Sequence, residues 1–576
     1  MIHLRKRGPV LIRFAAAAVG GAFVAWSFQP VGLWWLAWLG VAGLLVALLG
    51  RPSWGATVGM AVIWGFTTSM IALPWISEFV GAMPYVALSV TLGLMQIPGV
   101  LLARFILGAD GRGTGPRTPA AVPWPVRAVG AAAAILAGEA LLARWPFGGF
   151  PWLRIGWGQL GSPLDDAAVL GGVALVGFLA VLVSAGLASF VVKQWATGLV
   201  LILLPLAVGL VAQPAAGENA ATVRIAAVQG NVPRLGMDFN AQRRAVLKNH
   251  ADATRALAAR VRDGAEPRPD LVVWPENSSD VSPFRDPEAA RIIDAAAKDI
   301  KAPIIVGTFT YDDGVQNTMV LWDPVDGPVD GQRHEKIYLQ PFGETMPFRD
   351  LLRRITPLVD RAGDMTPGSG DGVIRVDLDR GAEGGGEGGA DENGGEARGG
   401  DDGGNGTREG QGEIGAANGA RAVVDTIAMG IATCYEVVFD DAFRDAVNNG
   451  ATILATPTNN ATFGFTDMTY QQLAMSRMRA IEFDRAVVVA ATSGVSAIVG
   501  PDGSVEQETG IFEQHVLTAD LPLRDNLTFA ARYGGAVEWA IVALAAFALI
   551  AAVRRAAAAV AAAREDEHQQ DSRKER

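Results

Sequence analysis

Cys434 is the single cysteine among 576 residues and stands in the string Thr433-Cys434-Tyr435-Glu436, at the end of an apolar, β-rich run. A lone thiol forms no disulfide within its chain, so it is either a small buried hydrophobic group or a reactive one. Residue type alone favours the inert alternative, because free cysteine is among the most buried residue types. Two other strings in the chain shift the balance toward reactivity.

These two strings supply a carboxylate and a cation. Glu276 follows the strand-like Leu271-Val272-Val273-Trp274 and a proline, which predicts a loop at the carboxyl end of a strand. Lys336 precedes Pro341-Phe342-Gly343-Glu344. A thiol attacks a carbonyl carbon as a thiolate, so a base must take its proton, and a cation can stabilise the resulting oxyanion. Singly, Glu276 and Lys336 are more often solvated surface charges; with Cys434 they predict a base, an oxyanion stabiliser and a nucleophile.

Histidine is the more usual partner of a reactive thiol. None of the five histidines stands in a recognisable Cys-His context, although His334 lies only two residues before Lys336. Glu276 is therefore the better candidate base.

The segment 222–522, which carries all three strings, alternates between strand-like and helix-like patterns. Strands are predicted at 223–228, 271–274, 303–307, 318–322, 452–456, 486–492 and 496–499, and helices at 240–263, 287–299, 439–448 and 467–484. Such alternation predicts one α/β domain in which helices cover sheets.

One segment does not fit this domain. Residues 379–420 are mostly Gly, Glu, Asp and Asn, with almost no large apolar side chain, so they cannot bury enough surface to offset the entropy of ordering. The segment separates two strand-like pieces, 373–378 and 422–429. We predict a disordered insert in an expanded hairpin loop; an acidic binding segment is the alternative.

Composition separates a membrane part from a soluble part. Residues up to about 213 carry few acids, whereas the middle of the chain holds most of them, and the net charge of −11 argues against nucleic-acid binding. Apolar runs near the length that crosses a bilayer occur at 9–27, 31–50, 55–74, 84–107, 128–143, 167–190, 194–213 and 533–553. The fifth run is short and Ala-rich, and it contains Glu139.

Basic residues orient these runs. If eight helices alternate in direction, Arg5, Arg51, Arg104 and Arg554 fall on one side with most other Lys and Arg of the short loops, whereas Arg144 and Arg154 fall on the other. The excess marks the cytoplasmic side. Both termini, including the tail 554–576, are then cytoplasmic, and 214–532 lies outside. The basic start followed by an apolar run also resembles a signal peptide, but Arg13 interrupts the run and further spans follow, which favours a retained helix.

Together, the three strings resemble the nitrilase superfamily, whose members use Glu, Lys and Cys on an αββα sandwich. Gln229-Gly230-Asn231-Val232-Pro233 and Phe147-Gly148-Gly149-Phe150-Pro151-Trp152-Leu153 narrow the resemblance to the apolipoprotein N-acyltransferases, the integral membrane branch. The resemblance implies a multi-pass α-helical membrane bundle of about seven helices (1–213), a nitrilase-like α/β sandwich domain (222–522) and a final transmembrane helix (533–553).

The resemblance also implies roles for particular residues. Glu276 would be the general base, Lys336 the oxyanion stabiliser and Cys434 the nucleophile. Glu344, Tyr435 and Glu436 would support the site. No metal or organic cofactor is implied.

The implied reaction moves a fatty acyl chain from a phospholipid to Cys434 as a thioester, and then to the N-terminal amine of a diacylglyceryl-cysteine lipoprotein, at the extracytoplasmic face of a bacterial cytoplasmic membrane. Two alternatives remain open. A membrane-tethered nitrilase-type amidase would use water as the second nucleophile. An inactive membrane scaffold or transporter would form no thioester and would line its spans with polar residues.

Overall fold

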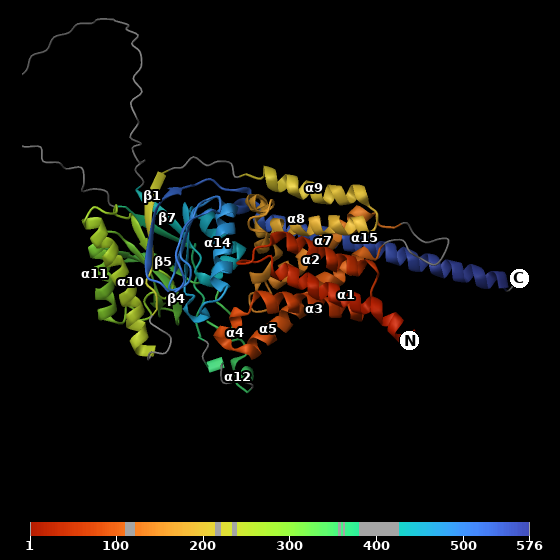
Figure 1. The fold of residues 1–576 in the computed structure, drawn as a ribbon, viewed down its shortest axis with the longest axis horizontal. Coiled ribbons are helices and arrows are strands. Elements are labelled where there is room, and N and C mark those ends of the chain that lie inside the picture. The colour runs from red at the N-terminus through yellow and green to blue at the C-terminus, as the bar shows by residue number, and fades with distance from the viewer. Residues whose placement is uncertain are drawn as a thin grey trace, which may run out of the picture.

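The computed structural model describes residues 2–109, 121–213, 221–232, 239–354, 359–360, 363–378 and 425–574. Figure 1 shows two parts along the longest axis of the molecule, a bundle of long helices and a layered α/β part. Both termini lie at the end of the bundle that faces away from the sheets. The predicted insert at 379–420 lies outside the described residues.

Apolar helices build the bundle. They are α1 (Ile2–Ala25), α2 (Trp34–Leu49), α3 (Trp54–Ala72), α4 (Trp75–Val80), α5 (Ala82–Met95), α6 (Ile97–Leu107), α7 (Trp124–Leu142), α8 (Ala168–Val191), α9 (Trp195–Val211) and α15 (Phe529–Lys574). In the described part of the chain, five segments are long and apolar enough to cross a membrane, namely Trp54–Ala72, Ala82–Leu107, Trp124–Leu142, Asp165–Val191 and Phe529–Ala562. Shorter apolar helices at Val10–Ala25, Trp34–Leu49 and Trp195–Val211 occupy the other three predicted runs.

Glycines let these helices approach closely. A Cβ atom on Gly20 of α1 would lie 2.7 Å from the carbonyl oxygen of Gly40 in α2, and one on Gly93 of α5 would lie 2.7 Å from the carbonyl oxygen of Val62 in α3. Such contacts suit apolar helices in lipid, where association depends on close backbone packing rather than on exclusion of water.

Two six-stranded sheets form the core of the α/β part. The first has the order β12-β1-β2-β3-β4-β5 and the second β11-β10-β9-β8-β7-β6. The strands are β1 (Ala221–Gln229), β2 (Leu271–Val273), β3 (Ile304–Thr310), β4 (Gln316–Asp323), β5 (Gly327–Glu335), β6 (Val373–Asp377), β7 (Thr426–Ile431), β8 (Ile453–Thr458), β9 (Val487–Ala491), β10 (Ala497–Val499), β11 (Val505–Glu508) and β12 (His515–Leu523). In each sheet the central pairs, β1–β2–β3 and β7–β8–β9, are parallel.

Helices cover the outer face of each sheet. α10 (Phe239–Arg262) and α11 (Pro287–Ile300) pack on the first sheet, and α13 (Asp440–Asn448) and α14 (Met468–Phe483) on the second. Fully buried side chains such as Ile225, Met429 and Val488 fill the space between the sheets. The predicted αββα sandwich joined to a helical membrane bundle is therefore confirmed.

Some elements depart from the sequence-based expectations. β5 and β11 lie at sheet edges, are largely exposed and lack an alternation of apolar and polar residues. They form strands because they pair with a neighbouring strand, so their composition did not predict them. The predicted span 84–107 is divided at Gln96 into α5 and α6. The final helix continues through the predicted tail to Lys574.

The expected hairpin around the insert is present in the described residues. β6 and β7 pair in antiparallel register from Val373↔Gly430 to Asp377↔Thr426. The chain therefore leaves and re-enters the sheet at adjacent positions.

Candidate active site

The two sheets bring the three predicted residues into one buried region. Glu276 follows β2 and Lys336 follows β5 of the first sheet, whereas Cys434 follows β7 of the second. Their exposed fractions are 3%, 2% and 6%. Burial to this extent rules out solvated surface roles for Glu276 and Lys336, because charged side chains are almost never fully buried unless they are paired.

Lys336 joins two carboxylates. Its Nζ atom donates to Oε1 of Glu276 at 2.9 Å and to Oε1 of Glu344 at 2.8 Å. Burial opposes the charge of Lys336, but the negative charges of Glu276 and Glu344 outweigh it and raise the pKa of the ammonium well above its usual value. Lys336 is therefore a fixed cation in this site.

Glu276 is held through both of its carboxylate oxygens. Oε1 accepts from Lys336 and from Nδ2 of Asn317 at 2.7 Å, and Oε2 accepts from the backbone N–H of Asn459 at 3.0 Å. Asn317 also donates to Glu344 at 3.3 Å. These donors fix the orientation of the carboxylate.

Cys434 adopts a left-handed backbone conformation, with φ of 52°, at the first residue of the 3₁₀ helix Cys434–Val438. Positive φ is uncommon for a residue other than glycine and is concentrated at functional sites. Burial and the charge of Glu276 raise the pKa of the Cys434 thiol to about 12, against the opposing effect of Lys336. The resting thiol is therefore protonated at neutral pH and needs a base to become a nucleophile.

Glu436 connects the segment around Cys434 to the segment that follows Lys336 through hydrogen bonds. Its carboxylate accepts from the backbone N–H groups of Thr433, Ile337 and Tyr338 at 2.8, 2.7 and 3.1 Å, and His334 Nε2 lies 2.8 Å away. Burial raises the pKa of Glu436, but His334, Lys336 and the backbone N–H of Thr433 lower it, and the lowering effects are larger. Glu436 is therefore a structural clamp within the candidate site.

Tyr435 points from the site toward the bundle. Its hydroxyl donates to the carbonyl oxygen of Gly149 at 3.2 Å, and its ring stacks parallel to that of Trp152 at 6.2 Å. Phe439 contacts the Tyr435 ring edge-on, with 5.3 Å between the ring centroids. The string 147–153 between the fifth and sixth apolar runs is thus part of the surroundings of the candidate nucleophile.

The role of Asn317 and the structural use of His334 were not predicted from the sequence. Asn317 lies in β4 and is 2% exposed. A polar residue next to the apolar 318–322 run was the available signal, because a buried amide must find hydrogen-bond partners. His334 was noted for its closeness to Lys336, but its partner lies 102 residues away in the chain.

A second buried group of charges, which we call the junction cluster, connects the sandwich to the bundle. Arg154 donates to Asp440 at 2.6 Å and to Glu538 of α15 at 3.0 Å. Arg479 of α14 donates to Asp440 at 2.9 Å and to Glu482 at 2.5 Å. Arg479 also donates to the carbonyl oxygen of Val437, three residues after Cys434, so the junction cluster touches the 3₁₀ helix that carries the thiol.

Comparisons with known proteins define the class of this architecture. The family model described as carbon-nitrogen hydrolase matches residues 224–526, which is more than half of the chain. A solved structure of Saccharomyces cerevisiae Nit3, a member of the nitrilase superfamily, covers 52% of this chain and 90% of its own length at 16% identity with a TM-score of 0.32. The match to the family model assigns the chain to the class of carbon-nitrogen hydrolases.

The rest of the chain narrows the class. The model described as apolipoprotein N-acyltransferase N-terminal domain matches residues 20–186. The "Apolipoprotein N-acyltransferase" of Mycolicibacterium smegmatis is 36% identical over 93% of this chain and 85% of its own length, and that of Geobacter metallireducens is 27% identical over 94% and 95%. The chain belongs to the apolipoprotein N-acyltransferase family.

Proposed function

We propose that the protein transfers a fatty acyl chain from a phospholipid to the N-terminal amine of a diacylglyceryl-modified lipoprotein, through a thioester on Cys434. The observation that carries this proposal is the buried arrangement in which Lys336 joins Glu276 and Glu344 and acts electrostatically on the thiol of Cys434. Family membership supports the acyltransferase chemistry.

In the first half-reaction Glu276 takes the proton of the Cys434 thiol, and the sulfur attacks the ester carbonyl carbon of the phospholipid. Lys336 stabilises the oxyanion that forms, because it is a fixed positive charge in a buried site. The ester C–O bond then breaks, and the lysophospholipid leaves with the proton returned by Glu276.

In the second half-reaction the neutral amine of the lipoprotein attacks the thioester carbonyl. The C–S bond breaks as the amide bond forms, and the proton lost by the amine returns to the sulfur through Glu276. Glu344 holds Lys336 from the other side and keeps the ammonium between the two carboxylates. The two half-reactions balance without a redox step or a metal ion.

Exposed aromatic side chains beside the site support the proposal that its substrates are lipids. Phe147 makes edge-on contacts at 5.7 Å with both Phe342 and Phe348, and all three are exposed by 42% or more. Phe342 lies two residues before Glu344, so an apolar surface begins next to the site. Keeping acyl chains in contact with apolar surface matters, because exposing each CH₂ group to water costs about 0.8 kcal/mol.

We place the sandwich on the extracytoplasmic face of a bacterial cytoplasmic membrane, with both termini in the cytoplasm. The basic residues of the short loops support this orientation. A membrane-impermeant thiol reagent added to intact spheroplasts should reach acyl-free Cys434. Labelling that requires disruption of the membrane would contradict the orientation.

Product analysis tests the proposed reaction. Purified protein with a phospholipid and a diacylglyceryl-cysteine peptide should yield a lysophospholipid and an N-acylated peptide. The Cys434→Ser variant should lose several orders of magnitude of this activity, as removal of a covalent nucleophile does. Release of free fatty acid with no acylated peptide would instead identify a hydrolase.

A further inference from the structure

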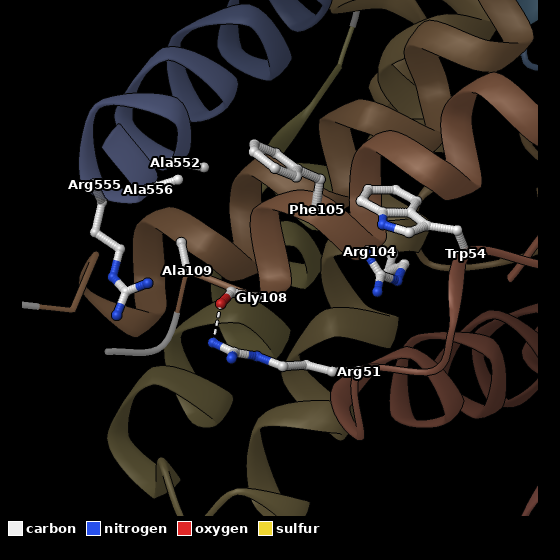
Figure 2. A pocket seen from close by; sticks show the side chains of 9 residues that line it. All are labelled: Arg51, Trp54, Arg104, Phe105, Gly108, Ala109, Ala552, Arg555 and Ala556. Atoms are coloured by element: carbon white, nitrogen blue, oxygen red, sulfur yellow. Dashed lines mark hydrogen bonds between the residues drawn. The ribbon is translucent and has the colours of Figure 1, made fainter. Parts of the chain in front are cut away.

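A cavity of about 210 Å³ opens between helix ends of the bundle, away from the candidate active site. Figure 2 shows the residues that line it. They come from the start of α3 and the loop before it, from the end of α6 and the residues after it, and from the distal part of α15: Arg51, Trp54, Arg104, Phe105, Gly108, Ala109, Ala552, Arg555 and Ala556. We call it the arginine pocket. Because α15 starts beside the sandwich at Phe529, Ala552 lies about 35 Å further along the helix.

Two of the arginines are anchored by the backbone. Arg51 Nη2 donates to the carbonyl oxygen of Gly108 (Figure 2). Arg104 Nε donates to the carbonyl oxygen of Pro52 at 2.9 Å, and its guanidinium carbon lies 3.8 Å above the ring of Trp54. A guanidinium is planar and always charged, so each anchored group presents a positive charge in a fixed orientation.

Arg555 differs from Arg51 and Arg104 in its contacts with the described residues. Its Nε and Nη2 atoms are buried, and no hydrogen-bond partner for them occurs among the described residues. Buried charged donors without partners are costly, so a ligand that supplies acceptors to these two atoms would be stabilised here. The described lining residues include no carboxylate, so an acceptor must come from outside this set.

The surroundings point to a membrane lipid. Trp54 is 51% exposed at the start of α3, as is common for tryptophan at the level of lipid headgroups. The volume is below the roughly 300–1,000 Å³ typical of pockets for drug-sized ligands, which suits a headgroup rather than a whole lipid. The small side chains of Ala552 and Ala556 leave space for the headgroup beside Arg555.

We propose that the arginine pocket binds the phosphate-containing headgroup of an anionic phospholipid in the leaflet that faces away from the sandwich. Three guanidinium groups supply the charge and the planar donors that phosphate oxygens prefer. This lipid is separate from the acyl donor, since the two sites lie at opposite ends of the bundle. It would tie α3, α6 and α15 together.

Native mass spectrometry of the full-length protein titrated with phosphatidylglycerol or phosphatidylcholine tests the proposal. Wild-type protein should retain phosphatidylglycerol in preference to phosphatidylcholine. Arg555→Gln should weaken this binding about tenfold, the usual loss for one charge-assisted hydrogen-bonding group. Arg554→Gln, the matched control, removes the same charge from the adjacent position, which does not line the pocket, and should bind as wild type.

Other outcomes would overturn the proposal. Equal losses in the two variants would show a general attraction of basic residues to anionic lipid, and displacement of phosphatidylglycerol by excess inorganic phosphate would show a site for free phosphate. If Arg555→Gln fails to fold, Ala556→Leu fills the pocket without changing charge and should also weaken phosphatidylglycerol binding. Undiminished binding by this folded variant would contradict the assignment.

Discussion

The candidate active site and the junction cluster both bury several charges, but these charges contact different parts of the molecule. At the site, one cation, Lys336, faces two carboxylates, Glu276 and Glu344. In the junction cluster two arginines, Arg154 and Arg479, pair with three carboxylates, Asp440, Glu482 and Glu538. These ion pairs connect the sandwich to the bundle, whereas the carboxylates of the site lie beside a thiol, from which one of them can accept a proton.

This contrast predicts that changes at the site affect chemistry and that changes in the junction cluster affect stability. Each buried pair also carries a desolvation cost, so removing one partner leaves an uncompensated charge.

The largest effect is expected for Glu276→Gln. The amide keeps the shape and an acceptor for Lys336 but cannot take a proton, so acyl transfer should fall by about 10²–10⁴-fold while the melting temperature changes little. Glu335→Gln is the matched control, because Glu335 is next to Lys336 but bonds to Arg333 and Gln316 instead. Near-normal turnover by folded Glu276→Gln would remove Glu276 from its proposed role.

The next effect is expected for Arg154→Gln in the junction cluster. Losing the ion pairs to Asp440 and Glu538 should lower the free energy of unfolding by about 3–5 kcal/mol, the usual result of breaking a buried pair. Arg224→Gln, which removes a more exposed pair with Asp520, should cost about 1 kcal/mol or less. Denaturation in detergent measures both. An Arg154→Gln protein with normal stability but without acyl transfer activity would contradict the expected difference between the two regions.

A smaller effect concerns the pH dependence of Cys434. Since its pKa is raised to about 12, the thiolate fraction at neutral pH is far below that of a free cysteine, and alkylation should rise about tenfold per pH unit without a plateau near 8.5. Lys336→Met should slow alkylation, because Lys336 favours the thiolate, and Glu276→Gln should accelerate it. A plateau below pH 9 in acyl-free protein would contradict the raised pKa.

The smallest effect is expected for deleting residues 381–419. The flanking strands β6 and β7 pair at Asp377↔Thr426, and Leu378 N–H donates to Asp425 at 2.7 Å, so a short Gly-containing turn can join them. Loop length alters stability by only about 0.6 kcal/mol per doubling. Extending the deletion through Val376 and Ile427, which are buried between the sheets, should destabilise the protein. Normal folding with lost acyl transfer would show that the insert acts on substrate.

The sequence made some of these features predictable because their signals are local. Apolar runs located the eight apolar helical segments of the bundle in the described part of the chain, and strand-like runs before Glu276 and Cys434 placed both residues at the ends of strands. The chemistry of the three strings suggested that they act together, and the resemblance to a family supported this grouping. No local signal indicated the contact itself, since Glu276 and Lys336 lie 60 residues apart.

Other features could not be predicted, because they depend on contacts between distant segments. The pair Arg154–Glu538 spans 384 residues, and nothing near either residue indicates the other. Edge strand β5 has no apolar pattern and exists through its pairing with β4. Asn317 takes its importance from two carboxylates that reach it from different loops.

The most direct test of the account is mass spectrometry of intact protein incubated with a phospholipid and no acceptor. Cys434 should carry one acyl chain through a bond that hydroxylamine cleaves, and adding a diacylglyceryl-cysteine peptide should remove it and yield the acylated peptide. Cys434→Ala should carry none. An active protein with no acyl group on Cys434, or an adduct that the acceptor does not discharge, would contradict the proposed thioester.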